Sequence, residues 1–434
     1  MAGKPPIPCC TAAKSLATAC GSAALPRSSP HAFPDRIFAM AASPRPNDPE
    51  TAIREAVAAL EPRLIEIRRD IHAHPELAFE EVRTSGIVAA ELSRMGIAHR
   101  TGIGRTGVVG VIEGGRPGPT LAIRADMDAL PIHEMTGLPF ASTVDGKMHA
   151  CGHDIHTTTL LGAAEVLKDL APQLAGRVLL VFQPAEEALG GAAAMVKDGV
   201  LEGVDIALGF HNHPDMPAGQ FGYCRGSTLA AADRFDLVIR GKSGHAAHPD
   251  KAVDPIVAAG AFIAQAQTVV SRELDPLMPG VVTIGMIHGG TAPNIIPETV
   301  ELRGTVRTLH HAARDVAEAG LKRLATGLEA MHRVECTLSY RRGVPPLVNA
   351  DSVLDPAIAA VRRQFGDVVV EGRPSMGAED FAEFAERVPA FQLRIGSGAP
   401  GRHDHLHNDR YQPDERCIGL GAQALTRIAL DMLA

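Results

Sequence analysis

The sequence predicts an α/β fold in which helices flank a mostly parallel sheet and a smaller α+β module is inserted. Between residues 49 and 230, apolar strand-like runs alternate with helical segments, which is typical of parallel sheets. Residues 231–341 then show the order strand, helix, strand, strand, helix, strand, which is ferredoxin-like. Helix and strand patterns resume in residues 342–434. The sequence therefore predicts a discontinuous α/β domain with the module inserted into it.

The first part is predicted to open with two helices and to continue with buried strands. Apolar residues at helical spacing indicate helices that end near Pro75 and near Gly96. The strands that follow share one design, an apolar run that closes on acids or imidazoles. Parallel sheets bind ligands beyond the carboxyl ends of their strands, so these polar ends predict a site there. After the short run GVVGVIEG (107–114), the strands are TLAIRADMD (120–128), RVLLVFQPAEE (177–187) and VDIALGFHNHP (204–214).

The inserted module is predicted from four strand-like runs and two helical ones. The first run alternates apolar and polar residues, as a strand with one buried face does. The strands are RFDLVIRGKSGHAAHP (234–249), GVVTIGMIHGG (280–290), TVELRGTVRTL (299–309) and RVECTLSYRRG (333–343), and the helices are at 254–274 and 313–332. A later strand, PAFQLRIGSG (389–398), belongs to the resumed α/β pattern.

Composition excludes several classes of protein. The 434 residues are 45% hydrophobic and 21% charged, so the chain can bury a sizeable core. A net charge of −8, no Trp and three Tyr argue against a nucleic-acid-binding protein. The chain has no run of 18 apolar residues, so no membrane span is expected. Seven scattered Cys, an odd number, do not make a disulfide framework, and we expect a reducing, cytoplasmic location.

Residues 1–48 differ from the rest of the chain. They are rich in Ala, Pro and Ser, and no acid precedes Asp35. We interpret them as a disordered leader or as an extension upstream of a natural start at Met40. A transit peptide is the alternative, because such segments are Ser-rich and acid-poor. Only three Lys or Arg precede Asp35, and no clear amphipathic helix is present, which favours the first interpretation.

Residue types that bind metals gather at the ends of predicted elements. In MHACGHDIHTTTLL, Cys151 and His153 stand where a helical segment begins. Taken alone, each is more often structural than a ligand. The pair Glu186-Glu187, His211 and His407 follow runs predicted as buried strands. Thiolate, imidazole and carboxylate together suit divalent transition metals, and five ligands exceed one tetrahedral site, which indicates two ions that share a bridge.

Eight motifs occur in an order that resembles a known family. They are RADMDALP, HACGHDIHT, FQPAEE, GFHNHP, GHAAHP, APNIIP, GAEDF and LHN. From about residue 50 to the end, the chain resembles the metal-dependent aminoacylase and carboxypeptidase family. It is most similar to the amidohydrolase branch, which includes hippurate hydrolases and auxin–amino acid conjugate hydrolases. The resemblance implies a two-metal exopeptidase-like catalytic domain at 49–230 and 342–434, and a lid or dimerisation domain at 231–341.

The resemblance also implies the roles of the motif residues. Glu186 takes the position of the general base, which removes a proton from water and returns it to the leaving amine. We interpret Asp128 as an acid that orients a metal ligand or Glu186. Asp126 has either the same kind of role or a structural one. The implied ligands of two divalent ions (zinc, manganese, cobalt or nickel) are Cys151, His153, Glu187, His211 and His407. We interpret His149, His156 and His213 as neighbours, with a ligand role left open for each.

Three residues of the inserted module are expected to act on substrate. In the family, the histidine that matches His245 reaches the substrate carbonyl across a dimer interface, a role suited to an oxyanion donor. Asn294 in APNIIP is expected to donate to the same region, with a turn role as the alternative. Arg307 is expected to pair with a substrate carboxylate, with an exposed strand position as the alternative. Ala378 departs from the Ser that is usual in GAEDF, and Asp250 stands where many relatives carry His.

Together these observations predict a metal-dependent amidohydrolase that cleaves the amide of an N-acyl amino acid to a carboxylate and a free amino acid. The expected partners are the small-molecule substrate and a second copy of the chain in a homodimer, and neither nucleic acid nor membrane is expected. A metallo-dipeptidase or carboxypeptidase on the same scaffold is the nearest alternative. A non-catalytic binding protein and a closed structural metal site are less consistent with five ligands beside a further acid.

Overall fold

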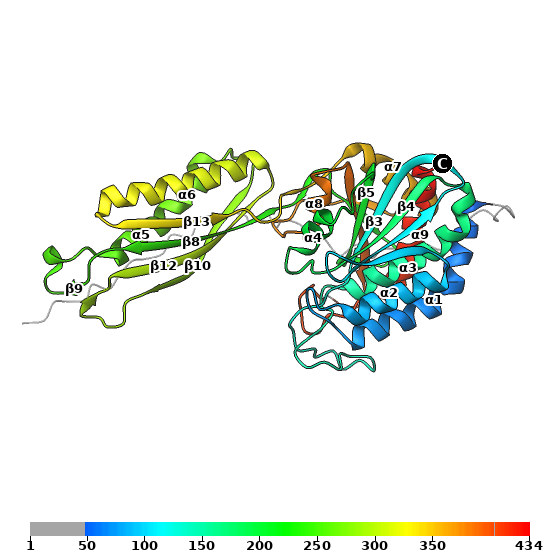
Figure 1. Cartoon of the computed structure of the whole chain (residues 1–434), viewed down its shortest axis with the longest axis horizontal. Helices are drawn as coiled ribbons and strands as arrows, with labels where there is room; N and C mark the ends of the chain where they lie inside the picture. Colours follow the sequence, from blue (N-terminus) through cyan, green and yellow to red (C-terminus); the bar gives the residue numbers. More distant parts are fainter. Residues whose placement is uncertain (1–47, 403) are drawn as a thin grey trace, which may run out of the picture. The chain divides into compact units, whose positions relative to one another are not determined.

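A computed structural model describes residues 48–402 and 404–434 (Figure 1). The interpretation of residues 1–48 as a leader lies outside the described residues, apart from Asp48, which precedes the first helix. Across the two described ranges, none of the helices combines the length and the apolar character that crossing a membrane requires.

The larger of the two main sheets has eight strands in the order β1-β2-β4-β3-β5-β16-β6-β15. Its four central strands, β4, β3, β5 and β16, run parallel to one another, which confirms the predicted fold class. Their carboxyl ends therefore meet at one edge. The strands are β1 Ala98–Ile103, β2 Gly107–Glu113, β3 Arg116–Asp126, β4 Ala175–Gln183, β5 Ile206–Pro217, β6 Phe221–Tyr223, β15 Val369–Glu371 and β16 Ala390–Gly398.

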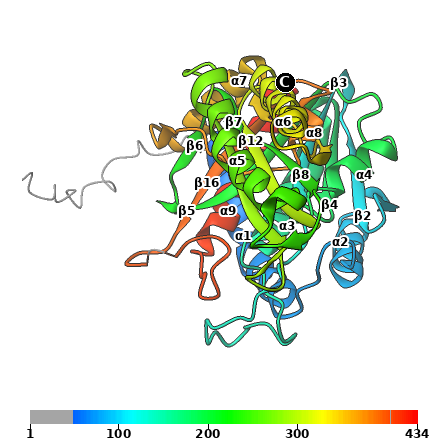
Figure 2. The same ribbon diagram turned by 90° about the vertical axis from the view of Figure 1, so that its left-hand side faces the viewer.

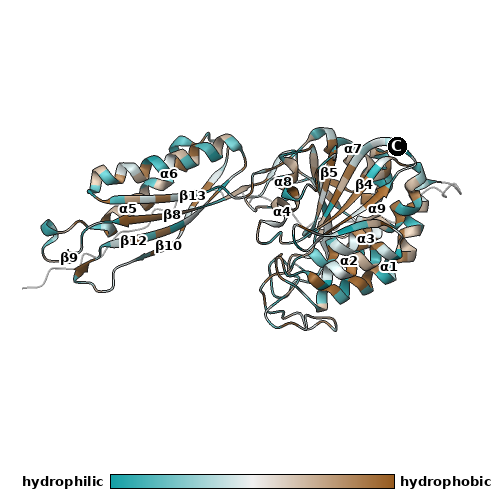
Figure 3. Ribbon diagram, in the orientation of Figure 1, coloured by the Kyte–Doolittle hydropathy of each residue, from teal (hydrophilic) through white to brown (hydrophobic). Residues whose placement is uncertain are grey.

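Helices cover both faces of this sheet, so its central strands are buried on both sides. The last seven residues of β3 are all buried, which explains why its sequence is mostly apolar and does not alternate between apolar and polar residues. Figure 3 shows the strands of this sheet largely in brown, the hydrophobic colour. One face packs against α2 Val82–Arg94, α3 His153–Leu170, α7 Asp351–Phe365 and α9 Arg416–Met432, and the other against α4 Gly191–Lys197 and α8 Ala382–Ala385. The first helix, α1 Pro49–Ala73, packs on α3 and α9.

The second sheet has four antiparallel strands in the order β10-β12-β8-β13 and its own hydrophobic core. Its two helices contact each other and the sheet, and Figure 2 shows them side by side. The chain order β8-α5-β10-β12-α6-β13 confirms the predicted ferredoxin-like order, whereas the exact domain boundaries stay a prediction. The elements are β8 Ala231–Arg240, α5 Pro255–Thr268, β10 Gly280–Gly289, β12 Thr299–Thr308, α6 His311–His332 and β13 Glu335–Arg341.

Two short ribbons complete the described secondary structure. The strands β9 (Gly244–His245) and β11 (Ile295–Ile296) pair with each other, as do β7 (Gly226–Leu229) and β14 (Leu347–Asn349). The helix α5 continues into one π-helical turn, Val269–Glu273.

Candidate metal centre

The loop that enters α3 places a thiol and an imidazole side by side. Gly152 has a φ of +84°, a left-handed conformation that favours glycine, and it separates Cys151 from His153, the first residue of α3. A Cβ on Gly152 would lie 2.5 Å from Nδ2 of Asn212. That same amide donates a hydrogen bond of 2.6 Å to the carbonyl of Cys151. The loop is therefore fixed by a contact that only glycine permits.

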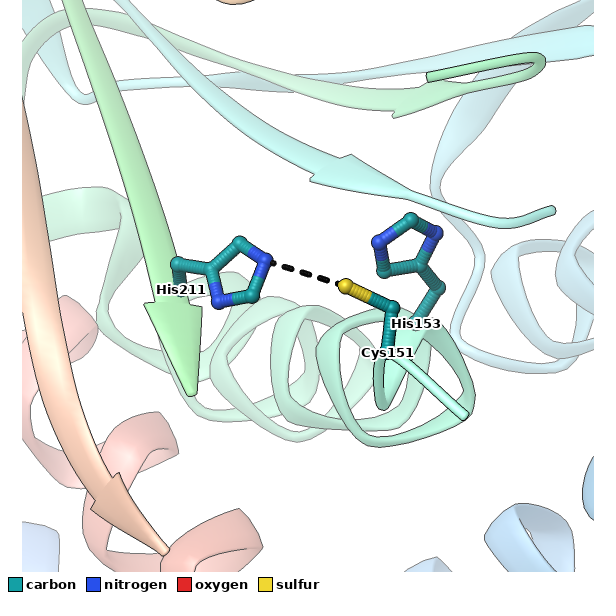
Figure 4. A group of neighbouring side chains, drawn as sticks. All are labelled: Cys151, His153 and His211. Carbon is teal, nitrogen blue, oxygen red and sulfur yellow. Dashed lines mark hydrogen bonds between the residues drawn. The ribbon is translucent and has the colours of Figure 1, made fainter. Parts of the chain in front are cut away.

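His211 completes a group of three potential donors around the thiol. It lies on β5, and its Nε2 is 3.5 Å from Sγ of Cys151, as Figure 4 shows. One ligand atom each from Cys151, His153 and His211 lies within 4.8 Å of the others. Both imidazoles use Nδ1 elsewhere: His153 donates to Oδ1 of Asp128 at 3.2 Å, and His211 donates to the carbonyl of Asn212 at 2.7 Å. This arrangement leaves Nε2 of each ring for a ligand.

Glu186 and Glu187 lie in a turn beyond β4, which ends at Gln183. Strand alternation therefore does not separate the two acids. Instead, Ala185 adopts a φ of +52° and its amide donates to Glu81, a buried acid, at 2.8 Å. The amides of Glu186 and Glu187 both donate to Asp128, at 3.0 and 3.1 Å.

A second donor group joins Glu187 and His407 to the same thiol. Oε1 of Glu187 is 3.2 Å from Nε2 of His407 and 4.0 Å from Nε2 of His153. One ligand atom each from Cys151, Glu187 and His407 lies within 4.8 Å of the others, so the two groups share Cys151. His407 lies in a loop after β16 rather than at a strand end, with a φ of +62° and its amide bonded to the carbonyl of Ala150 at 2.8 Å.

The two aspartates of RADMD have different environments. Asp128 contacts His153 and both glutamate amides, as described above, so it links α3 to the turn beyond β4. Asp126 instead accepts from Nη1 of Arg124 at 2.7 Å and from Nδ1 of His156 at 2.5 Å. The backbone amide of Asn212 donates to Nε2 of His156, so both nitrogens of that ring have hydrogen-bond partners.

A buried charge network lies behind Glu186. Nη2 of Arg124 is 2.9 Å from both Glu379 and Asp380, and Gln183 donates to Asp380 at 2.7 Å. One oxygen each of Glu186, Glu379 and Asp380 lies within 4.8 Å of the others. Burial raises the pKa of Asp380 to about 8, with Arg124 opposing and Glu379 adding to the effect. Burial and the charges of Glu379 and Asp380 likewise raise the pKa of Glu186 well above its ordinary value.

Burial also shifts the thiol and imidazole groups. It raises the pKa of Cys151 and lowers that of His211. Burial opposes protonation of His153 too, but the charges of Asp126 and Cys151 outweigh it and raise the pKa of that imidazole. Burial lowers the pKa of His149 to about 3. These shifts have the directions expected for acids and bases crowded in an apolar setting.

A cavity of about 480 Å³ opens beside these groups. Of the predicted site residues, Cys151, Glu186, Glu187, His211, His407 and Arg307 line it. His153 and Asp128 are almost fully buried behind it. Other lining residues are Leu189, His213, Leu229, Ala378, Glu379, Gln392, Arg394 and Leu406.

His245 and Asn294 lie next to each other but are not among the residues that line this cavity. The amide of Ala246 donates to the carbonyl of Asn294 at 3.1 Å, and both residues are exposed. The structure thus gathers the predicted ligands, Glu186 and Arg307 around one cavity, and it places His245 and Asn294 together on the β9–β11 ribbon.

Comparisons with known proteins agree with this geometry. The model of peptidase family M20/M25/M40 matches residues 122–431. The chain belongs to this family. An N-acetylcysteine deacetylase of Bacillus subtilis is 40% identical over 377 residues, which cover 86% of this chain and 98% of the relative. IAA-amino acid hydrolase ILR1-like 2 of Arabidopsis thaliana is 40% identical over 376 residues, 85% of each chain. A crystal structure of a dinuclear metal-binding M20 peptidase from Bacillus subtilis superposes with a TM-score of 0.78 at 38% identity, covering 87% of this chain and 99% of that one.

Family membership confirms the resemblance found in the sequence, and with it the expectation of a metal-dependent hydrolase. Several residues of this M20 chain were nevertheless given no role from the sequence. Glu379 and Asp380 were recognised only as part of GAEDF. Arg124 and Arg394 each interrupt an apolar strand-like run, IRADMD and QLRIGSG, and such an interruption is the signal that marks a buried charge with a partner.

Proposed function

We propose that the chain hydrolyses the amide bond of N-acyl amino acids and releases a carboxylate and a free amino acid. The observation that carries the proposal is a pair of donor groups that share Cys151 and adjoin Glu186, an acid outside both groups. The names of the two relatives support an N-acyl amino acid substrate. A metallo-dipeptidase or carboxypeptidase is the second candidate, because a thermostable carboxypeptidase of Saccharolobus solfataricus is 37% identical over 384 residues.

The donor set fits two divalent metal ions. Nε2 of His153 and Oε1 of Glu187 are buried, lack a hydrogen-bond partner and lie 4.0 Å apart. The two atoms belong to different donor groups, so each group holds a buried ligand atom that is free to bind an ion. We assign Cys151, His153 and His211 to one ion and Cys151, Glu187 and His407 to the other. Zinc, manganese, cobalt and nickel all suit such ligands.

When bound, the ions would polarise the amide carbonyl and lower the pKa of a water molecule. The chain supplies the proton transfers through Glu186, whose carboxylate takes a proton from that water and passes it to the leaving nitrogen. Its raised pKa suits it to hold the proton between the two steps. Asp128 holds Glu186 and Glu187 through their amides, so the base and the ligand keep a fixed spacing.

His245 is proposed to act in a homodimer. The strand β10 is at the edge of the four-stranded sheet, and Met286 and Ile287 on it are 46% and 50% exposed. An exposed apolar edge strand is a surface on which a second copy can pair. In such a dimer His245 would reach the substrate of the neighbouring subunit, with Asn294 beside it.

The test is a substrate panel on chelated protein reloaded with each metal in turn. The panel contains hippurate, N-acetyl amino acids and dipeptides. Turnover of N-acyl amino acids that chelation abolishes and metal restores is expected. Full activity in metal-free protein, or turnover of dipeptides alone, would contradict the proposal.

The dimer role has its own test. Inactive His245→Ala and Glu186→Gln chains are mixed and allowed to exchange subunits. In a mixed dimer, one site receives the intact Glu186 of one chain and the intact His245 of the other, so part of the activity should return. Exchange without any returning activity would place His245 within its own chain's site or outside catalysis.

A further inference from the structure

Arg394 is an unexplained cation in the wall of the cavity. It lies on β16 directly beside His211 of β5 in the parallel ladder, so both side chains leave the sheet on the same face. Gln392, two residues earlier, also lines the cavity, whereas Leu393 and Ile395 are buried on the opposite face. The strand thus directs a guanidinium to the side of the sheet that carries the metal centre.

The guanidinium of Arg394 is held in place without a carboxylate. Its Nη2 donates to Oγ1 of Thr228 at 3.1 Å and to the carbonyl of Arg373 at 3.0 Å. A side chain at Gly372 would collide with its Nη1, so a glycine there leaves room for it. Within residues 48–402 and 404–434, Arg394 forms no ion pair, and burial lowers its pKa.

The arginines of the described chain that are almost fully buried behave differently. Each of them pairs with at least one carboxylate at 3.2 Å or less, because an unpaired buried charge is costly. They are Arg68, Arg124, Arg314 and Arg427. Arg394 and Arg307 are partly buried in the wall of one cavity, and in the described chain neither has such a partner. A ligand that carries negative charge would give these two arginines the anionic partner that the protein does not provide.

His213 adds a further polar group beside Arg394. It lines the same cavity, and its Nδ1 is buried without a hydrogen-bond partner. The leucines Leu189, Leu229 and Leu406 supply apolar contact in the same wall. The cavity therefore offers two guanidiniums, an imidazole and an apolar surface next to the metal centre.

We propose that Arg394 binds a second carboxylate of the substrate, so that the preferred substrates are dianionic N-acyl amino acids. The inference rests on the proposed function: the α-carboxylate that every N-acyl amino acid carries is assigned to Arg307, and Arg394 remains for another. The second carboxylate belongs either to the side chain of the amino acid or to the far end of the acyl group. Both sources present the same chemistry to Arg394, a planar carboxylate that a guanidinium binds through two hydrogen bonds.

Two matched pairs of substrates distinguish the sources. N-acetylglutamate is compared with N-acetylglutamine, and N-succinylalanine with its terminal amide, by kcat/KM on the metal-loaded protein. We expect one dianionic member to exceed its neutral isostere by about 10- to 100-fold, the scale of a hydrogen bond to a charged group. Arg394→Met should remove that preference and change kcat/KM for the isosteres by less than about threefold, and Arg394→Lys should keep part of it. Absence of a preference in both pairs would overturn the inference.

Arg373→Met is the control, because it removes an exposed neighbouring arginine that does not line the cavity. It should leave the preference intact, and an equal loss for Arg373→Met and Arg394→Met would also overturn the inference. Binding of N-acetylglutamate and N-acetylglutamine to metal-loaded Glu186→Gln is measured by calorimetry alongside. If no N-acyl amino acid is hydrolysed, the proposed function fails, whereas tighter binding of the dianion that depends on Arg394 still supports this subsite. Binding of N-succinylalanine and its terminal amide is measured in the same way, and equal binding within both pairs would overturn the inference.

Discussion

Replacement of Gly152 by alanine tests how the start of α3 sets the geometry of the metal centre. The residue has a φ of +84°, and an added Cβ would lie 2.5 Å from Nδ2 of Asn212. The left-handed conformation costs an alanine about 1–2 kcal/mol. The clash also displaces Asn212 from the carbonyl of Cys151, which it reaches at 2.6 Å. Loss of a buried hydrogen bond adds about 1–3 kcal/mol.

Gly146→Ala is the matched control. Gly146 has a φ of +73°, and nothing lies within 4 Å of an added Cβ, so this variant carries the backbone cost without the clash. In chelated protein, we expect the free energy of unfolding by urea to fall by about 1–2 kcal/mol in the control. In Gly152→Ala it should fall by about 2–5 kcal/mol.

Metal affinity separates the two variants further. It is measured by competition with a chromophoric chelator. Because the clash acts on the loop that carries Cys151 and His153, Gly152→Ala should bind metal about 10- to 100-fold more weakly, as other changes behind metal ligands do. Gly146→Ala should bind it like the wild type. Equal stability and equal metal affinity in the two variants would refute the reasoning, because the loop would then have absorbed the Cβ without moving its ligands.

Three further changes probe the groups around the centre. Arg124→Met should lower the free energy of unfolding in urea by about 3–5 kcal/mol, because it leaves buried carboxylates unpaired. The control, Arg116→Met, changes an exposed position on the same strand and should lower it little. A similar decrease for both variants would contradict this. Glu186→Gln should keep its metal content and lose about 10²- to 10⁴-fold in kcat, and loss of metal would make Glu186 a ligand. Burial lowers the pKa of His149 from 6.5 to about 3. Between these two values, the imidazole is protonated in the unfolded chain but not in the folded chain. The contribution of His149 to the free energy of unfolding is therefore fully present above about pH 6.5 and is lost as the pH falls toward 3. In chelated protein, His149→Gln should therefore reduce the slope of unfolding free energy against pH in that window by up to about 1.4 kcal/mol per unit, and unchanged slopes would show that His149 does not titrate in this way.

The sequence predicted the fold because the fold depends on local patterns. Apolar runs and helical periodicity recur at the right spacing, and they place strands β3, β4 and β5 in one parallel sheet. The inserted module follows from the same kind of evidence, since its alternating strands bury one face only. The positions of Glu186 and Glu187 were harder to predict from the sequence. They depend on a left-handed backbone at Ala185 and on Asp128, 58 residues away from Glu186, and no periodicity encodes either.

The candidate site was predictable where a motif carries its own chemistry, and not where chemistry arises from packing. Cys151 and His153 are two residues apart in sequence and metal-binding in type, so their spacing draws attention to them. Arg124 and Asp380 are 256 residues apart, and their contact exists only because α8 lies on the sheet face to which β3 directs Arg124. Arg394 was passed over for a related reason. A lone arginine in an apolar strand does not show whether its partner is a carboxylate of the chain or a ligand.

The charge balance of the centre is consistent with the proposal that Glu186 serves as base while its neighbour Glu187 serves as ligand. Glu186 belongs to two groups, one with His153 and Glu187 and one with Glu379 and Asp380. Burial is the main cause that raises the pKa of Glu186, and the negative charges of Glu379 and Asp380, which Arg124 alone does not compensate, add to the effect. Cations bound by the ligands of the first group would act in the opposite direction and favour the carboxylate. Burial and the neighbouring acids thus raise the pKa of Glu186, and bound cations would lower it. Together these effects can give Glu186 a pKa at which it both takes a proton from water and gives it up. Burial opposes ionisation of Glu187 as well, but the contacts with His407 and His153 outweigh it and lower the pKa of Glu187. It therefore remains a carboxylate, as the proposed ligand role requires.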